Sequence, residues 1–420
     1  MHKRSSAQLA ACFVLLLTAC QPQSISPTQP AGFKNEAVWQ NQTRPEADFS
    51  IQGNKHRASP TPSPTPSPSA SPTPTPSPSL SPSPTPSPSS GEDLSVEVAG
   101  WYNDGWDDES HAVYTNHNQL FSEVNPYWYN LGTSDGGTEA TKTDGSVYER
   151  SYVYNATKVN QVHSGHDLVI PTIGDNAAGQ INKILASSTA RQALINNLVQ
   201  KAVNRNYDGF DINFELGQAT GQAAFALFVD DLAKQLHAVG KRLSVTIKAA
   251  DSATAESWEI FDYQRLGQTA ADRFKVMMYD HNFDAGANVP GPIADYNWMV
   301  SSLKYMISRG LPPGKIQLGL HNYAWVWKQG SNGSYSLQYP FSTWSAVQAK
   351  TSVFQWNSTA KEAWTDYSSS GLQYRTYIGD AQTVAQRLPL VKTFGLAGVV
   401  FWTLGREDQR IYADLPLQFG

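Results

Sequence analysis

From residue 94 to the C-terminus, short apolar runs alternate with longer stretches that repeat apolar positions at helical spacing. The runs are short and rich in β-branched and aromatic residues, as buried strands are. We expect eight strands, over 95–102, 121–131, 167–173, 209–215, 242–249, 274–279, 315–321 and 398–402. Helices are expected between them, for example over 190–204, 221–239, 292–308 and 381–393. Strands and helices in this alternation predict an α/β fold, a (β/α)8 TIM barrel.

One connection of the predicted barrel is too long for a plain loop. Residues 322–380, between the seventh strand and the seventh helix, are rich in Trp, Tyr, Ser and Gly. Structureless loops of that length are uncommon inside a compact domain. We therefore expect an inserted loop or a small β subdomain on the rim of the barrel.

The first 19 residues have the pattern of a secretory signal, a basic start followed by an apolar run too short for a transmembrane helix. The run ends in Leu17-Thr18-Ala19-Cys20, which resembles the lipobox of bacterial lipoproteins. That resemblance implies cleavage before Cys20, a lipid on Cys20, and anchorage to a membrane of the bacterial cell envelope. The alternative is an ordinary signal that leaves Cys20 as a free thiol. Cys12 leaves with the signal, so no internal disulfide is possible.

Residues 20–93 lack the pattern of a packed domain and are expected to be disordered. Over 59–90, proline alternates with serine or threonine almost without a break. Such a sequence favours polyproline II at about 3.1 Å per residue, so about 30 residues make a spacer on the order of 90 Å. This linker would lift the barrel away from a membrane, or serve as a passive tether with no length requirement.

Charge and composition narrow the class of partner. The formal net charge is −5, the pI is about 6.0, and no basic cluster occurs, so nucleic acid is not an expected partner. The histidines have no metal-binding spacing, and we expect neither a metal nor another cofactor. The 12 Trp and 19 Tyr suit the apolar faces of sugar rings, although most must be core. We expect a monomer.

The segment 208–215, Asp-Gly-Phe-Asp-Ile-Asn-Phe-Glu, carries the strongest chemical signal. Because side chains alternate along a strand, Asp211, Asn213 and Glu215 point to one face and the apolar residues to the other. The polar groups would line the barrel interior and end in a carboxylic acid at the mouth. A carboxylate at Asp211 would help to keep one proton on the pair with Glu215, as a general acid requires. The alternative is a buried polar ladder that only fixes the strand register.

This segment resembles the DxxDxDxE signature of glycoside hydrolase family 18, the chitinases and their relatives. Asp208, Asp211 and Glu215 match the signature. Asn213 stands where the family usually has Asp. The resemblance extends over residues 94–420.

Other predicted strands match the family in the correct order. Met277-Met278-Tyr279-Asp280 resembles the MxYD motif, whose Tyr contacts the substrate acetamide, and Phe401-Trp402 matches the Trp under the sugar site. Residues 319–323 resemble the seventh strand and residues 167–174, less distinctively, the third. Details such as Asn125-Pro126-Tyr127-Trp128-Tyr129 are most similar to the bacterial branch of spore-cortex and peptidoglycan N-acetylglucosaminidases.

The resemblance implies a retaining, substrate-assisted hydrolysis of β-linked N-acetylglucosamine glycans, of the chitin or peptidoglycan type. Glu215 would protonate the glycosidic oxygen while the 2-acetamido oxygen of the sugar attacks the anomeric carbon. Glu215 would then deprotonate the incoming water. Asn213 and Tyr279 would hold the acetamide. The expected substrate-binding residues are Trp402, Asp280, Asp208, Met277 and Tyr323.

Asn213 departs from the family signature, and this departure affects the expected rate of the reaction. The usual Asp accepts a hydrogen bond from the acetamide N–H and offsets developing positive charge, whereas Asn does only the first. Losing a buried charge-assisted hydrogen bond costs about 1–3 kcal/mol, roughly one to two decades in rate. Slower turnover is expected, with Asp211 sharing the electrostatic work.

Two functions other than hydrolysis stay open. One is a barrel that binds N-acetylglucosamine glycans without cleaving them, although such relatives usually lack the terminal Glu. The other is a purely structural surface module, which leaves the polar triad unexplained. Tyr323, Trp128 and Trp101 are either outer sugar subsites or core. Exo or endo action, which the insertion would decide through cleft depth, also stays open.

Overall fold

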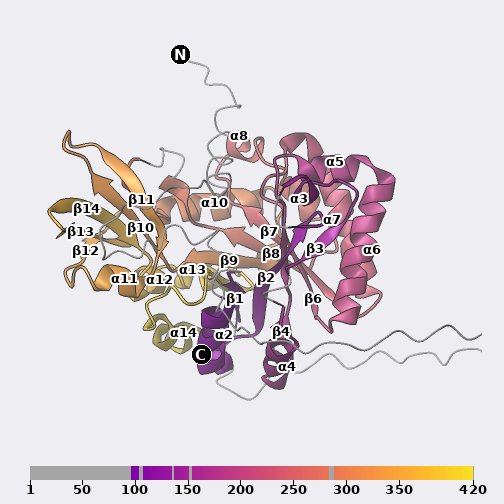
Figure 1. Cartoon of the computed structure of the whole chain (residues 1–420), viewed down its shortest axis with the longest axis horizontal. Helices are drawn as coiled ribbons and strands as arrows, with labels where there is room; N and C mark the ends of the chain where they lie inside the picture. The colour runs from indigo at the N-terminus through magenta and orange to yellow at the C-terminus, as the bar shows by residue number, and fades with distance from the viewer. Residues whose placement is uncertain (1–95, 104–106, 135–136, 151–153, 283–287, 420) are drawn as a thin grey trace, which may run out of the picture.

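The computed structural model describes most of the chain that follows the predicted linker (Figure 1). The described residues are 96–103, 107–134, 137–150, 154–282 and 288–419. The predicted signal over 1–19, the lipidation site Cys20 and the linker within 20–93 lie outside them. Within the described ranges, no helix combines the length and apolar character needed to cross a membrane.

Eight parallel strands close into a barrel, which confirms the predicted fold. They are β1 Glu97–Tyr102, β2 Glu123–Leu131, β5 Thr172–Gly174, β6 Gly209–Asn213, β7 Arg242–Lys248, β8 Arg273–Met277, β9 Ile316–His321 and β15 Gly398–Trp402. Each strand pairs with the next in this order, and β1 pairs with both β2 and β15, which closes the ring. A short strand, β3 Val147–Glu149, runs antiparallel to β2 outside the ring.

Helices connect the strands, and Figure 1 shows α5, α6 and α7 together on one side of the barrel. The helices are α2 Asp107–His117, α3 Gly137–Ala140, α4 Ala156–Ser164, α5 Gln180–Ala186, α6 Ser188–Asn204, α7 Gln222–His237, α8 Ala253–Glu256, α9 Tyr263–Leu266, α10 Tyr296–Ser308 and α14 Ile411–Phe419. Three predicted helices are confirmed as α6, α7 and α10. The last begins four residues later than expected because Asp295 caps it, accepting from the amides of Asn297 and Trp298.

Proline interrupts two predicted elements. The third strand divides into β4 Leu168–Val169 and β5, because Pro171 between them has no amide hydrogen to donate. The helix predicted over 381–393 divides into α12 Ala381–Ala385 and α13 Pro389–Phe394. Pro389 stands in the first turn of α13, where its missing donor costs nothing.

The insertion between β9 and α12 is a five-stranded antiparallel sheet, as predicted for a small β subdomain. Its elements are β10 Ala324–Gln329, β11 Tyr335–Ser342, α11 Trp344–Gln348, β12 Gln355–Asn357, β13 Glu362–Ser369 and β14 Leu372–Ile378. On one face, Val326, Val347 and Ile378 form a small core of its own. On the other face, Trp325 and Trp327 join an aromatic cluster shared with the barrel.

The inside of the barrel is charged at its centre. The buried ammonium of Lys275 on β8 donates to Glu123 Oε1 at 2.5 Å and to Ser244 Oγ at 3.0 Å. It also lies 3.7 Å from Asp211 Oδ1. Buried charges are tolerated when they are paired and hydrogen-bonded. Strands β2, β6 and β8 therefore bring the charges of Glu123, Asp211 and Lys275 together inside the barrel.

Candidate active site

Strand β6 carries polar side chains into the barrel. Asp211 is fully buried, with Thr172 of β5 and Ser244 of β7 as its neighbours in register. The apolar residues that alternate with it lie in the core, as strand alternation predicts. Glu215 follows the end of β6 by two residues and is partly buried at the C-terminal mouth.

Asp211 is enclosed by hydrogen-bond donors. Its carboxylate accepts from Trp101 Nε1 at 3.1 Å, Thr172 Oγ1 at 2.9 Å, Ser244 Oγ at 2.8 Å and Thr246 Oγ1 at 3.0 Å. These contacts, together with the nearby Lys275 ammonium, show that Asp211 links four strands. They do not support the predicted sharing of a proton between Asp211 and Glu215, because the charged side chains that shift the pKa of Glu215 are Lys248 and Glu259.

Asn213 is bonded to Glu215. Asn213 Nδ2 donates to Glu215 Oε1 at 2.8 Å, which fixes the orientation of both side chains. Among the described residues, no group donates to the buried Asn213 Oδ1. Buried polar atoms rarely stay unsatisfied without a reason. This oxygen is therefore available to accept an N–H from a ligand.

The pKa of Glu215 is raised above its usual value. Burial is the main cause, because a desolvated carboxylate is costly, and the charge of Glu259 adds to it. Lys248 and the Asn213 amide act in the opposite direction without cancelling the rise. Glu215 is thus biased toward the protonated form that a general acid needs.

Asp175 is a second carboxyl at this point of the mouth. It directly follows β5, is 7% exposed, and accepts from the Leu216 amide through Oδ1 at 3.3 Å and Oδ2 at 3.1 Å. Burial and the neighbouring charge of Glu215 raise the pKa of Asp175 well above its usual value. The carboxylate charge of Glu215 therefore opposes the ionisation of Asp175.

Tyr279 and Asp280 follow β8 on the other side of the mouth. Burial raises the pKa of the Tyr279 hydroxyl well above its usual value, with help from the charge of Glu215, so Tyr279 remains a donor. Burial and Glu215 also raise the pKa of Asp280 to about 7, although Tyr323 Oη donates to Asp280 Oδ1 at 2.6 Å. Met277, the last residue of β8, is partly buried beside them.

Trp402 forms the aromatic side of the site. It ends β15, and its ring centroid lies 5.9 Å from that of Trp101 in an edge-to-face arrangement. Trp402 and Tyr279 both pack against the cluster of Tyr323, Trp325 and Trp327. The predicted residues Glu215, Asn213, Tyr279, Asp280, Met277 and Trp402 thus gather at the strand ends.

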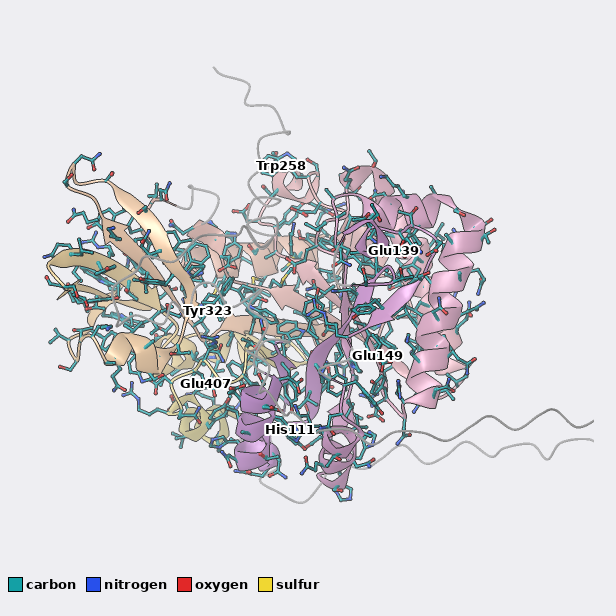
Figure 2. All side chains as sticks on the ribbon, viewed as in Figure 1. His111, Glu139, Glu149, Trp258, Tyr323 and Glu407 are labelled. Atoms are coloured by element: carbon teal, nitrogen blue, oxygen red, sulfur yellow. The ribbon has the colours of Figure 1, made fainter. Side chains whose placement is uncertain are left out.

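Three aromatic residues considered as sugar subsites are core. Tyr323, Trp128 and Trp101 are 0%, 1% and 2% exposed. The prediction that Tyr323 binds substrate is therefore wrong. It lies behind the site, where Figure 2 shows it between the barrel and the inserted sheet, and its hydroxyl holds Asp280 in place.

The sequence profile of glycosyl hydrolases family 18 matches residues 100–407. The chain belongs to this family. This family 18 chain is 25% identical over 273 residues to the cortical fragment-lytic enzyme of Bacillus anthracis, covering 63% of the chain and 62% of that relative. It is 24% identical over 313 residues to chitinase A1 of Niallia circulans, covering 62% of the chain and 44% of that relative. The match thus spans less than two thirds of either relative.

A solved structure agrees with the family 18 fold. The spore cortex-lytic enzyme SleL of Bacillus cereus superposes with a TM-score of 0.64 at 21% identity, over 78% of this chain and 75% of that one. At this identity the likeness shows the fold alone. The chemistry of the site has to come from the side chains of this chain.

Asp208, the first residue of the family 18 signature, is not part of the site. It stands before β6, at the opposite end of the strand from Glu215. Its Oδ2 accepts from the Val169 amide at 2.8 Å and lies 2.9 Å from His163 Nε2. The prediction that Asp208 binds substrate is therefore wrong, because its bonds tie the base of β6 to β4 and α4.

Sequence reasoning missed two charged groups of this family 18 site. Asp175 stands two residues after the strand predicted over 167–173, where mouth residues of a barrel occur, so its position was a usable signal. Lys248 ends β7, and its Nζ lies 3.0 Å from Glu259 Oε2. Nothing in the sequence alone indicates this pair, because its members stand on a strand and on a later loop. Elsewhere in the described chain, His, Cys, Asp and Glu form no group suited to a metal.

Proposed function

We propose that this protein hydrolyses β-linked N-acetylglucosamine glycans by a retaining, substrate-assisted reaction with Glu215 as general acid and base. The observation that carries the proposal is the Asn213–Glu215 pair at the mouth. The Asn213 amide nitrogen orients the acid, while the buried Oδ1 of the same side chain has an unmet hydrogen bond. Tyr279 adds a hydroxyl donor and Trp402 an apolar surface, which are the groups that an N-acetyl substituent requires.

In the first step, Glu215 donates its proton to the glycosidic oxygen and the bond from that oxygen to C1 breaks. The acetamide oxygen of the same sugar forms a new bond to C1, which gives an oxazolinium. Asn213 Oδ1 accepts the acetamide N–H and the Tyr279 hydroxyl donates to the acetamide oxygen. Holding the amide in this geometry lowers the entropic cost of attack.

In the second step, the Glu215 carboxylate takes a proton from water, and the resulting hydroxyl adds to C1. The bond between C1 and the acetamide oxygen breaks, which restores the acetamide and the acid. C1 is inverted twice, so its configuration is retained. No carboxylate of the protein has to act as nucleophile.

Because Asn213 is neutral, we expect a low turnover rate. A carboxylate at this position would offset the positive charge of the oxazolinium, and the Asn213 amide does so less well. Asp211 contributes little, because its charge is already balanced by four donors and by Lys275. We therefore propose turnover that is slower than an Asp at this position would give.

The proposed substrate class is supported by the pocket and by what the names of two relatives have in common. The relatives are named for chitin and for cortical fragments, and the chemistry that these names share is a β-linked N-acetylglucosamine. The proposed substrate is therefore a glycan with that sugar on the non-reducing side of the scissile bond. Parallel digests of chitin oligomers and purified peptidoglycan, read by mass spectrometry, distinguish the two sources.

Glu215→Gln tests the catalytic role. The new amide keeps an oxygen for Asn213 Nδ2 but has no acidic proton to give, so hydrolysis of a chromogenic N-acetylglucosamine oligomer should fall at least about 100-fold. The matched control is Glu139→Gln, an exposed residue of α3 (Figure 2) whose carboxylate contacts Thr133 and Lys142 rather than the residues around Glu215, and it should keep wild-type activity. Glycan binding by the wild type with no cleavage would contradict the proposal and favour the lectin-like alternative.

A further inference from the structure

We infer that the mouth carries an outer sugar subsite, which we call the β7 subsite, formed by Trp258, Lys248 and Glu259. It lies beyond the pocket of Glu215 and would hold a more distant residue of an extended glycan chain. The inference rests on the proposed function for the identity of the ligand. It adds a binding surface that the reaction itself does not require.

Register places Lys248 on the inner side of the barrel. Strands β6 and β7 pair Asp211 with Ser244 and Ile212 with Val245, so continuing the ladder brings Glu215 opposite Lys248. Ser244 and Thr246 both donate to Asp211 and so face inward. Lys248 is two residues further along and shares that face. Its ammonium therefore stands next to the pocket, on the β7 side.

Glu259 extends this polar surface outward. Lys248 Nζ and Glu259 Oε2 are 3.0 Å apart, and the two side chains are 21% and 22% exposed. The pair is open enough to meet solvent or a ligand. A carboxylate has about four acceptor sites and an ammonium has three donors, which suits the hydroxyl groups of a sugar.

Trp258 is the apolar part of the subsite. Its side chain is 55% exposed, and it is the sole exposed aromatic residue within the described chain. Figure 2 shows it at the edge of the molecule beside α8, the short helix that follows β7. Connections after barrel strands lie at the C-terminal mouth. A flat indole here can stack on the apolar face of a pyranose ring.

The loop that carries Trp258 is held in place. Glu259 forms a β-bridge with Gln218, and Gln222 Nε2 donates to the Glu259 carbonyl at 3.0 Å. The Trp258 amide donates to the Ala255 carbonyl at 3.2 Å. An exposed indole on a fixed loop is presented at little cost in conformational entropy, which favours binding.

The bridge also limits the distance between the subsite and the acid. Gln218 is three residues after Glu215, so their Cα atoms are at most about 11 Å apart. Trp258 adjoins the bridged residue. A short oligosaccharide bound in the Glu215 pocket therefore reaches the β7 subsite, whereas a single sugar does not.

Trp258→Ala tests the inference. In this variant, the KM for a chitin hexamer divided by the KM for a chromogenic dimer should rise about three- to tenfold above the wild-type ratio. The reason is that only the longer chain reaches the stacking surface. Trp258→Phe should recover part of the loss. Leu227→Ala, which removes another exposed apolar side chain on the outer face of α7, should leave the ratio unchanged. An unchanged ratio in Trp258→Ala would overturn the inference.

A binding measurement separates this inference from the proposed function. In the Glu215→Gln background, titration with the chitin hexamer should quench tryptophan fluorescence, and adding Trp258→Ala should weaken binding by the same three- to tenfold. If the wild type cleaves nothing but this difference appears, the proposed function fails and the subsite stands. If the wild type cleaves and this difference is absent, the subsite fails alone.

Discussion

Asp175 and Glu215 place two carboxyl groups at one point of the barrel mouth. Burial raises the pKa of both, and the charge of Glu215 raises the pKa of Asp175 further. The charges that act on Glu215 come from Lys248 and Glu259. Asp175 is therefore a neutral neighbour while Glu215 ionises. The raised pKa of Glu215 keeps the general acid protonated and extends activity toward neutral pH.

Asp175→Asn should leave the pH dependence of the reaction in place. The Asn side-chain oxygen can still accept from the Leu216 amide, and a neutral amide replaces a neutral carboxyl beside Glu215. The pKa of Glu215 should therefore be unchanged, and the basic limb of kcat/KM against pH should stay at the same pH. A limb that moves to lower pH would contradict this account, because it would show that Asp175 is ionised and raises the pKa of Glu215.

At the scale of elements, the buried charge of Glu362 joins the inserted sheet to the barrel. Glu362 begins β13, is fully buried, and accepts from the amides of Ile293 at 2.7 Å and Ala294 at 3.0 Å. Arg387, also fully buried, donates to it at 3.1 Å. Burial raises the pKa of Glu362 to about 7, even with Arg387 beside it. This ion pair and the aromatic cluster of Trp325 and Trp327 thus attach the insertion to the barrel.

Glu362→Ala should destabilise the protein strongly. It leaves the Arg387 charge without its carboxylate and two backbone amides without an acceptor, so the free energy of unfolding should fall by about 3–5 kcal/mol. Denaturation in urea, followed by circular dichroism, measures this loss. Glu139→Ala, at an exposed position, should change the same free energy by no more than about 0.5 kcal/mol. A similar small change in Glu362→Ala would contradict the proposed attachment.

The elements were predictable because local periodicity reports burial directly. All eight barrel strands and the inserted β subdomain occur where the apolar pattern indicates. The differences arise at Pro171, at Pro389 and at the start of α10. The polar face of β6 was equally predictable, because strand alternation fixes it. Asp208 was assigned to the site because it belongs to the family signature, although it precedes the strand whose other end carries Glu215.

Other site residues depend on contacts between distant parts of the chain. Tyr323 carries an aromatic ring in a sugar-binding family, yet its burial is set by Trp325 and Trp327 of the insertion. The ion pair of Lys248 with Glu259 depends on strand register and on a loop tethered to Gln218. No local pattern in the sequence encodes either arrangement.

At the scale of the whole molecule, the mouth is built from two parts of the chain. Figure 1 shows the inserted sheet on one side of the barrel and helices α5 to α7 on the other. The insertion contributes Trp325 and Trp327 to the cluster that supports Tyr279 and Trp402. The β7 connection contributes Trp258 at the rim. The aromatic side of the pocket therefore forms only when the barrel and the insertion fold together.

The measurement that tests the central claim most directly is the configuration of the first product. Proton NMR of a chitin oligomer digest, recorded before mutarotation, resolves the anomer at each new reducing end. Attack by the substrate's own acetamide, with Glu215 serving first as acid and then as base, predicts that the β-anomer forms first. Initial release of the α-anomer would contradict that account, because it would require direct attack of water at C1.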